Sequence, residues 1–365
     1  MKKKVACCYG TRPEFIKIAP VVLALRKFHS DIKQVLICSG QHRELLRGIG
    51  EDFGLKPDIE LNVRKKIGDS GDLSELAAGL LKGFDGVFRR VKPDAVAVQG
   101  DAASAAFAAL AAFHLRLPVY YIEAGLRTYD LSAPFPEEGY RQMISRVASV
   151  LFCPTEIDKK NLLNEGIPEN KIHVVGNTVV DALKIILKGP ALLRQGRAFT
   201  DKKIVVTVHR RENWGDPLKR ILLSLKKIRD NNPEYKFIVS VHPNPIVKNV
   251  IESFLKDEPG FELIIPPTYR KFISILGQSS GVITDSGGIQ EESPTLEIPC
   301  LVVREKTERI AGVKLGWSFL AGTGGDEIIS GFRWLINWKR PKGGNPYGDG
   351  KASVRIADVI EKIWQ

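Results

Sequence analysis

The stretch "KKVACCYGTRPEFIK", residues 3–17, joins a short apolar run to a turn that carries Arg12, Glu14 and Lys17. The apolar run ends at a glycine and predicts a buried strand over residues 3–9, and the residues after the turn predict a helix. Exposed cations have little structural reason to gather on such a strand-to-helix turn. The turn is therefore a candidate binding site for a small anion.

The same alternation of a short apolar run and a helical segment recurs along the chain. Runs such as "QVLICSG" (34–40) and "DAVAVQG" (94–100) precede segments with helical periodicity, and the theme restarts at "KKIVVTVH" (202–209). This alternation predicts parallel sheets covered by helices on both faces. We therefore expect an α/β protein with two Rossmann-like doubly wound domains facing a cleft. The expected divisions are an N-terminal domain over 1–178, a C-terminal domain over 179–348, and a final helix over 349–365 that packs back across the domains.

Length and composition are those of an ordinary globular protein. The chain has 365 residues, 44% of them hydrophobic and 26% charged, and is too long for one hydrophobic core. The cysteines form no C-x-x-C pair, so we expect neither a structural metal site nor a disulfide framework. The apolar run behind the basic amino terminus is shorter than the core of a signal peptide, and no segment approaches the roughly twenty apolar residues of a membrane span. These features predict a reducing, cytoplasmic setting and no membrane partner.

The formal net charge of +12 and the isoelectric point near 9.4 raise the question of a nucleic-acid partner. The Lys and Arg residues are scattered along helix-like segments such as "PLKRILLSLKKIRD" (217–230), where they alternate with apolar residues. No zinc-finger pattern, RNP motif or basic run with interleaved aromatic residues occurs in the sequence. Solvated helix faces therefore explain most of the charge, and we expect no nucleic-acid partner. A small anionic ligand stays open, because it needs only a few cations at one site.

Charged side chains follow the predicted strands at their carboxyl ends, where doubly wound sheets bind ligands. In the first half these residues are Asp101, Glu123, Arg127, Glu137 and Glu138. In the second half they are His209, Arg210, Arg211, His242, Asp285, Ser286 and Glu292. Taken singly, each acid of the first half has an ordinary explanation: Asp101 as a helix cap, Glu123 as a partner for Arg127, and Glu137 as an acid in the first turn of a helix.

The turn "TDSGGIQEE", residues 284–292, has the clearest physical interpretation. A strand followed by Asp-Ser-Gly-Gly and a helix offers free backbone N–H groups, and the glycines let a phosphate approach closely. Glu292 could accept hydrogen bonds from both hydroxyls of a ribose. Alternatively, Asp285 and Ser286 merely cap the helix. Since Arg12 and Lys17 add two cations from the first half, the sequence predicts a diphosphate site.

Ten motifs occur in order between about residue 4 and residue 360. The series "GTRPEFIK", "GDAAS", "EAGLRT", "PFPEEGYR", "VVGNTVVDAL", "VHRREN", "VHPNP", "TDSGGIQEE", "TERIAGV" and "NPYGDGKAS" resembles the motif set of the non-hydrolysing UDP-N-acetylglucosamine 2-epimerases. The resemblance implies the glycosyltransferase-B fold, a UDP-sugar substrate and a homodimer. It also implies that neither a metal nor another cofactor is needed.

The resemblance further implies the reaction and the residues that perform it. These epimerases invert carbon 2 of the sugar by eliminating UDP to give 2-acetamidoglucal and then adding UDP back. Asp101, Glu123 and Glu137 match the family's catalytic acids, and His209 matches a histidine that donates to the leaving diphosphate or shuttles a proton. The residues implied to hold the substrate are Arg12, Lys17, Asp101, Glu123, His209, Arg210, His242, Ser286, Gly287, Gly288, Glu292 and Arg309, with Phe272 lining the uracil pocket.

The chain departs from the family pattern in several places. Ala102 and Ala103 replace two threonines, which removes their hydroxyls, and "TERIAG" lacks a proline and an acid just past Arg309.

A further departure concerns the loop that binds a second, activating UDP-N-acetylglucosamine in bacterial members. Gln41, His42 and Arg43 are present as a possible effector loop, but Glu44 stands where a glutamine is usual. A carboxylate repels an anionic effector, so we predict no activation by a second substrate molecule.

Other functions stay open from the sequence. A 2-epimerase of a modified UDP-sugar such as UDP-2,3-diacetamido-glucuronate would use the same machinery. A glycosyltransferase and a hydrolysing epimerase share the fold, and a polyanion binder would use charge alone. The epimerase is favoured because ten ordered motifs support it, and because three sugar-side acids exceed what a glycosyltransferase needs.

Overall fold

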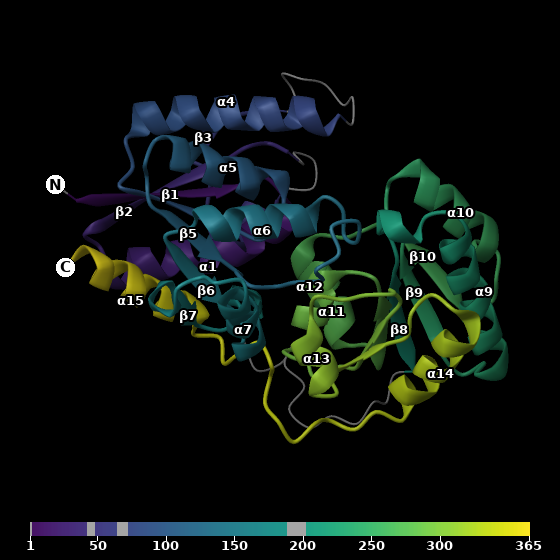
Figure 1. Cartoon of the computed structure of the whole chain (residues 1–365). Coiled ribbons are helices and arrows are strands. Elements are labelled where there is room, and N and C mark those ends of the chain that lie inside the picture. Colours follow the sequence, from purple (N-terminus) through teal and green to yellow (C-terminus); the bar gives the residue numbers. More distant parts are fainter. Residues whose placement is uncertain (1, 42–47, 64–71, 188–201) are drawn as a thin grey trace. The chain divides into compact units, whose positions relative to one another are not determined.

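The computed structural model describes residues 2–41, 48–63, 72–187 and 202–365 (Figure 1). The chain forms two compact units. The first unit contains Met1–Ile186 and Tyr347–Gln365, and the second contains Leu187–Pro346.

The first unit is built on a seven-stranded parallel sheet with the order β3-β2-β1-β4-β5-β6-β7. Its strands are β1 (Lys3–Tyr9), β2 (Ile32–Cys38), β3 (Ile59–Glu60), β4 (Ala95–Gln99), β5 (Val119–Ile122), β6 (Val150–Cys153) and β7 (Ile172–Val174). The strand order reverses between β1 and β4. In doubly wound sheets, ligands bind beyond the carboxyl ends of the strands at such a reversal. In this sheet the turns after β1 and β4 lie at that point.

Helices cover both faces of this sheet, which is why its central strands β1 and β4 are apolar except at their ends. Helices α4 (Leu73–Val91), α5 (Ala103–His114) and α6 (Glu137–Val147) pack on the face that carries Ala6 and Cys8. Helices α1 (Arg12–Phe28), α8 (Thr178–Ile186) and α15 (Ala352–Trp364) pack together, and Phe15 of α1 contacts Tyr9, whose side chain alternates with that of Cys8. Within the described residues of this unit, the remaining helices are α2 (Ile49–Phe53), α7 (Glu156–Asn164) and the short η2 (Glu169–Lys171).

The second unit repeats the plan with a six-stranded parallel sheet in the order β10-β9-β8-β11-β12-β13. Its strands are β8 (Lys203–Thr207), β9 (Lys236–Ser240), β10 (Phe261–Ile264), β11 (Gly281–Thr284), β12 (Cys300–Val302) and β13 (Ser318–Leu320). Its helices are η3 (Arg211–Asn213), α9 (Asp216–Asn231), α10 (Pro245–Leu255), α11 (Tyr269–Gly277), α12 (Gly287–Glu292), α13 (Ile310–Lys314) and α14 (Gly325–Ile336). The strand order reverses between β8 and β11, so the turns after these two strands share one edge. The predicted pair of parallel-sheet α/β domains is confirmed.

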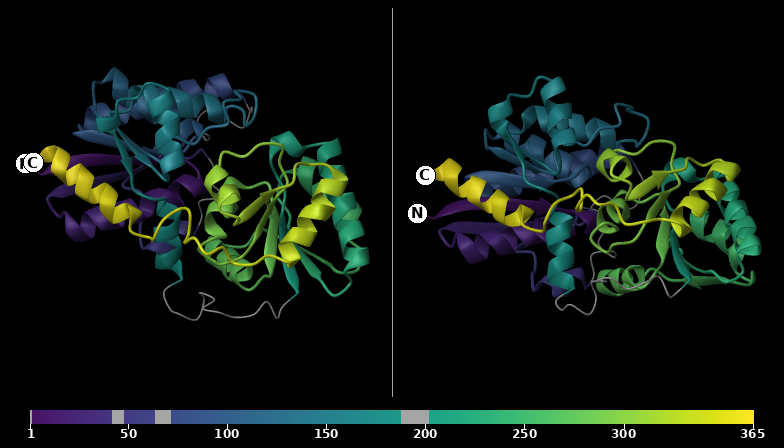
Figure 2. Two further views of the ribbon diagram at one scale, coloured as in Figure 1. Left: turned by 60° about the horizontal axis from the view of Figure 1, so that its bottom comes forward. Right: turned by 90° about the horizontal axis from the view of Figure 1, so that it is seen from below.

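The carboxyl-terminal segment belongs to the first unit, where α15 lies along α1 (Figure 2). The first residues of α15 bond to Asp181 of α8: the backbone N–H of Ser353 donates to Asp181 Oδ1 at 2.9 Å, and that of Ala352 donates to Oδ2 at 3.2 Å. At the other end of α15, Trp364 lies 6.2 Å from Tyr120 of β5. The sequence predicted a division after residue 178 and a final helix over 349–365 that packs back across the domains. The compact units instead keep α8 with the first unit, because α8 is bonded to α15 there.

The cysteines Cys7, Cys8, Cys38, Cys153 and Cys300 are free and buried. Burial raises the pKa of Cys7 and of Cys300 to about 12, so these thiols stay protonated at neutral pH. Within the described residues, no group of His, Cys, Asp and Glu side chains is arranged to hold a metal ion. In the same residues, no helix is long and apolar enough to cross a membrane.

Candidate active site

The turn after β1 is closed by a buried carboxylate, Glu14. The backbone N–H groups of Gly10 and Thr11 donate to Glu14 Oε2 at 3.0 and 2.8 Å. Ser104 of α5 approaches from the neighbouring turn, and its hydroxyl lies 2.7 Å from both Glu14 oxygens. Burial raises the pKa of Glu14 to about 7, although the hydrogen bonds from Ser104 and the turn oppose this rise. Glu14 therefore joins the turn that carries Arg12 to the turn that follows β4.

Glycine is required in this turn because three segments meet there. A Cβ atom on Gly10 would lie 2.1 Å from Ser39 Oγ and 2.7 Å from the Cβ of Ser104, which no side chain tolerates. The close approach of the β1 turn to the ends of β2 and α5 thus depends on Gly10.

Lys17 and Glu123 form a buried ion pair in the first unit. The ammonium of Lys17 donates to Glu123 Oε2, and the two side chains are 5% and 4% exposed. Gln99, the last residue of β4, donates from Nε2 to the same oxygen at 2.6 Å. Because two donors hold one carboxylate oxygen, the orientation of Glu123 is fixed at the carboxyl end of the sheet.

The backbone of Glu123 is in the left-handed region, with a φ of 68°. A non-glycine residue in such a conformation costs roughly 1 to 3 kcal/mol and persists only where its surroundings hold it. Here sheet hydrogen bonds hold it on both sides. Gly100 N–H donates to Ile122 O at 3.1 Å, and Ala124 N–H donates to Phe152 O at 3.0 Å. Such strain clusters at functional sites, which favours a functional role for Glu123.

Asp101 is held by a guanidinium that the sequence did not mark as part of the site. Arg141 of α6 donates to Asp101 Oδ2 through Nε at 2.9 Å and also through Nη2, and donates to Glu138 Oε2 through Nη1 at 2.9 Å. Burial disfavours the charge on Arg141, but Asp101 and Glu138 outweigh that effect and raise its pKa. Asp101 therefore does not cap α5, whose first residues follow Ala102.

The remaining predicted residues of the first unit lie in segments that follow strands of its sheet. Arg12 and Glu137 begin α1 and α6, and both are half-buried. Gln41 accepts a hydrogen bond from Ser104 N–H at 3.1 Å, next to the Glu14 cluster. His42 and Arg43 of the predicted effector loop lie outside the described residues.

In the second unit, the turn after β8 is organised by Asp285, which is fully buried at the end of β11. Asp285 accepts hydrogen bonds from the backbone N–H groups of His209 and Arg210 at 2.9 to 3.1 Å and from Asn213 Nδ2 at 2.9 Å. The imidazole Nδ1 of His209 is 3.4 Å from the same carboxylate. Asp285 is therefore not a helix cap; it fixes the "HRREN" turn and orients the His209 ring.

The ring of His209 stacks on that of His242, with centroids 5.5 Å apart and planes 9° apart. The backbone N–H of Asn244 donates to His242 Nδ1 at 3.1 Å, so in neutral His242 the proton is on Nε2. The stack brings together two predicted ligand-binding histidines from the adjacent strands β8 and β9.

Gly287, in the turn after β11, lies directly over a buried arginine. A Cβ atom on Gly287 would lie 2.7 Å from Cζ of Arg309, so any larger residue there requires the guanidinium to shift. Arg309 donates from Nε to Glu291 Oε1 at 2.9 Å and also pairs with Glu308. Arg304 lies beside them, and its pKa is lowered to about 10, first by burial and then by the charge of Arg210. The two guanidiniums below Gly287 are thus held in place by the carboxylates of Glu212, Glu291 and Glu308, which carry the opposite charge.

The acid predicted to bind a ribose is also held in place. Tyr269, the first residue of α11, donates from its hydroxyl to Glu292 Oε1 at 2.7 Å. Both side chains are buried, and Phe272 lies half-buried one turn farther along α11.

Comparison with known proteins decides the family. The sequence model described as UDP-N-acetylglucosamine 2-epimerase matches residues 25–361. The UDP-N-acetylglucosamine 2-epimerase of Neisseria meningitidis is 39% identical over 98% of this chain and 99% of its own length, and that of Bacillus subtilis is 38% identical over 99% and 96%. This chain belongs to the UDP-N-acetylglucosamine 2-epimerase family.

Solved structures agree with this assignment. The Neisseria meningitidis UDP-GlcNAc 2-epimerase bound to UDP-GlcNAc superposes with a TM-score of 0.92 at 38% identity, and covers 98% of this chain and 100% of that chain. The Methanocaldococcus jannaschii enzyme in complex with UDP-GlcNAc and UDP gives a TM-score of 0.86 at 36% identity, with 99% and 100% covered. MurG of Acinetobacter baumannii, at 14% identity and a TM-score of 0.58, shares the fold alone. The chain is an isomerase with the glycosyltransferase-B type of architecture.

Sequence reasoning missed several residues that hold the predicted epimerase site together. Arg141 and Ser104 close the motifs "PFPEEGYR" and "GDAAS", so their place in a motif was an available signal. Gln99 and Tyr269 carried no such signal. The sequence also left open that Glu123 pairs with Arg127, which is wrong: Arg127 pairs with Glu165 at 2.7 Å.

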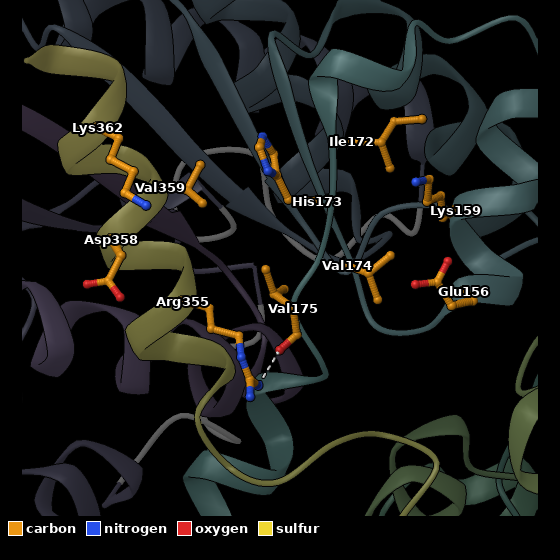
Figure 3. A pocket seen from close by; sticks show the side chains of 10 residues that line it. All are labelled: Glu156, Lys159, Ile172, His173, Val174, Val175, Arg355, Asp358, Val359 and Lys362. Atoms are coloured by element: carbon orange, nitrogen blue, oxygen red, sulfur yellow. Dashed lines mark hydrogen bonds between the residues drawn. The ribbon is translucent and has the colours of Figure 1, made fainter.

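A hollow of about 480 Å³ in the first unit lies beside β7, α7 and α15 (Figure 3). Its walls carry both signs of charge, including Lys159, Asp358 and Lys362, together with His173. Arg355 also lines it and donates from Nη1 to Val175 O at 3.1 Å. It contains none of the residues predicted for the epimerase site.

Proposed function

We propose that this protein interconverts UDP-N-acetylglucosamine and UDP-N-acetylmannosamine. The observation that carries the proposal is Glu123, a buried carboxylate fixed by Lys17 and Gln99 where the sheet ends. An acid or base that acts on a carbon must be held in one orientation, and this cluster supplies that. Family membership and the neighbouring Asp101 cluster support the same assignment.

The reaction we propose has two halves. A carboxylate takes the proton from carbon 2 of the sugar, the electron pair of that C–H bond forms a double bond to carbon 1, and UDP leaves with the electron pair of the C1–O bond. UDP then adds back to carbon 1 while carbon 2 receives a proton on its opposite face. Asp101, Glu123 and Glu137 share the proton transfers, since removal and return occur on different faces of the sugar.

We assign the departing UDP to the cationic and hydrogen-bonding groups predicted to hold it. Negative charge develops on the diphosphate as the C1–O bond breaks, and fixed donors stabilise it without reorganising. Arg12, His209 and Arg210 are the donors of this kind, and Ser286 with the glycines after it completes the diphosphate contacts. Asp285 supports this role for His209, because its carboxylate accepts a hydrogen bond from the backbone N–H of His209 and also lies 3.4 Å from the imidazole Nδ1, which fixes the orientation of the ring. Since Lys17 is paired with Glu123, we propose that Lys17 contacts the substrate next to the Glu123 carboxylate.

Turnover of UDP-N-acetylglucosamine in deuterium oxide, followed by NMR, tests the proposed function. UDP-N-acetylmannosamine with deuterium at carbon 2 is the expected product. An unlabelled product, free N-acetylmannosamine, or transfer of the sugar would contradict the proposal and indicate a different reaction. Turnover of only a modified UDP-sugar would keep the chemistry and change the substrate.

The three acids can be tested in the same assay. Asp101→Asn, Glu123→Gln and Glu137→Gln should each lower turnover by roughly a hundredfold or more, as for a lost general acid or base. At least one variant should release UDP and 2-acetamidoglucal. Three variants with nearly full activity would mean that the acids are structural.

The resemblance implies a homodimer, and the cysteines and the short apolar run at the amino terminus predict a cytoplasmic setting; we include both in the proposal. Light scattering of the purified protein measures the assembly directly. Fractionation of cells that produce the tagged protein tests the cytoplasmic location.

A further inference from the structure

Glu292 and Tyr269 form a buried, hydrogen-bonded pair in the second unit. Tyr269 Oη donates to Glu292 Oε1 at 2.7 Å, and the two residues are 5% and 6% exposed. A carboxylate buried to this extent has little water to orient it, so its protein donors decide where its oxygens lie. The tyrosine therefore helps to set the direction in which Glu292 accepts further hydrogen bonds.

The two residues sit on the elements predicted to contact a nucleoside. Glu292 ends α12, the helix that follows Ser286 and the glycines of the proposed diphosphate site. Tyr269 begins α11, and Phe272, predicted to line the uracil pocket, follows three residues later on the same face of that helix. Phe272, the ring predicted to contact the base, and Tyr269, the donor to Glu292, thus lie one turn apart on α11.

We infer that Tyr269 is a specificity-determining positioning residue, which holds Glu292 so that the enzyme prefers a ribonucleotide over a 2′-deoxyribonucleotide. An ionised carboxylate only accepts hydrogen bonds, and the hydroxyls of a ribose are the donors it can take. A ligand without the 2′-hydroxyl leaves the buried carboxylate with one donor fewer, which is costly in a desolvated site. The inference rests on the proposed function, since it presumes that the second unit binds the UDP portion.

Calorimetry with UDP and 2′-deoxy-UDP on the full chain tests this inference. A hydrogen bond to a charged group corresponds to a preference for UDP of roughly tenfold to a hundredfold in the wild type. In Tyr269→Phe the preference should fall to about threefold or less, while the affinity for 2′-deoxy-UDP should change less than about twofold. Equal weakening of both ligands, or an unchanged preference, would overturn the inference, because a purely structural tyrosine would not distinguish them.

A matched control and a second variant complete the design. Tyr235→Phe removes a hydroxyl from a tyrosine that packs on Phe332, 5.6 Å away, and should leave both affinities unchanged. Glu292→Gln should lower the preference by itself, and adding Tyr269→Phe to it should lower the preference no further. A further fall in the double variant would show that Tyr269 does not act through Glu292. This second comparison also decides the question if Tyr269→Phe alone does not fold.

The outcomes separate this inference from the proposed function. A wild-type protein that prefers UDP but has no epimerase activity refutes the proposed reaction and leaves the inference standing. A wild-type protein that epimerises but binds the two nucleotides equally refutes the inference alone. Absence of any UDP binding contradicts both.

Discussion

The carboxyl group of Glu14 should make the stability of the first unit fall as the pH rises. Burial raises the pKa of Glu14 from 4.5 to about 7. Between pH 4.5 and about pH 7, Glu14 therefore keeps its proton in the folded protein but has lost it in the unfolded chain. The stabilisation is complete below about pH 4.5 and is lost as the pH rises through about 7. At about 1.36 kcal/mol for each unit of pKa shift, the difference amounts to about 3 kcal/mol.

The groups packed around Glu14 do not titrate in the same window. Ser104 and the backbone of the turn only donate hydrogen bonds. Cys8, Tyr9 and Cys38 also face this carboxyl group. Burial raises the pKa of Cys38 to about 11 and raises those of Cys8 and Tyr9 as well, so all three stay neutral. The predicted pH dependence thus belongs to Glu14.

Urea unfolding of the wild type and of Glu14→Gln, followed by circular dichroism at several pH values, measures this effect. The amide keeps the shape of the side chain and an acceptor oxygen but does not titrate. The stability of the wild type relative to Glu14→Gln should fall by about 3 kcal/mol between about pH 4 and pH 8. Glu169→Gln, at an exposed carboxylate paired with Lys159, is the control and should show no such fall. If the free energies of unfolding of the wild type and Glu14→Gln differ by the same amount at about pH 4 and at about pH 8, the predicted role of Glu14 is wrong.

Three further predictions concern the Lys17–Glu123 ion pair and the residues predicted to bind UDP. Lys17→Met should destabilise the protein by about 3 to 5 kcal/mol in urea unfolding, because it leaves a buried charge, and adding Glu123→Gln should restore most of that loss. Gly287→Ala should weaken UDP binding at least tenfold by calorimetry, since the added methyl group would lie 2.7 Å from Arg309 Cζ and must displace it. Arg12→Ala should weaken UDP binding by about 1.5 to 3 kcal/mol, and unchanged affinity would contradict its assignment to the diphosphate.

Much of the fold was predictable because the relevant information is local. Residues 3–17 contain a strand, a turn and the start of a helix, and the same order recurs in both halves. Parallel strands buried on both faces read as apolar runs, and their carboxyl ends lie at one edge of the sheet. The sequence could therefore place the candidate acids and cations in turns that share an edge, and its ordered motifs indicated the family.

The partners of those side chains required the tertiary structure. Lys17 and Glu123 are 106 positions apart, and nothing in their spacing excludes the nearby Arg127, which pairs with Glu165 instead. The pairing depends on which strand ends lie side by side and on the left-handed backbone of Glu123. Sequence alone thus determined which residues reach the carboxyl edge of each sheet. Only the folded chain decided which of them bond to one another, because a hydrogen bond depends on distances of a few tenths of an ångström that are set by the packing of several elements at once.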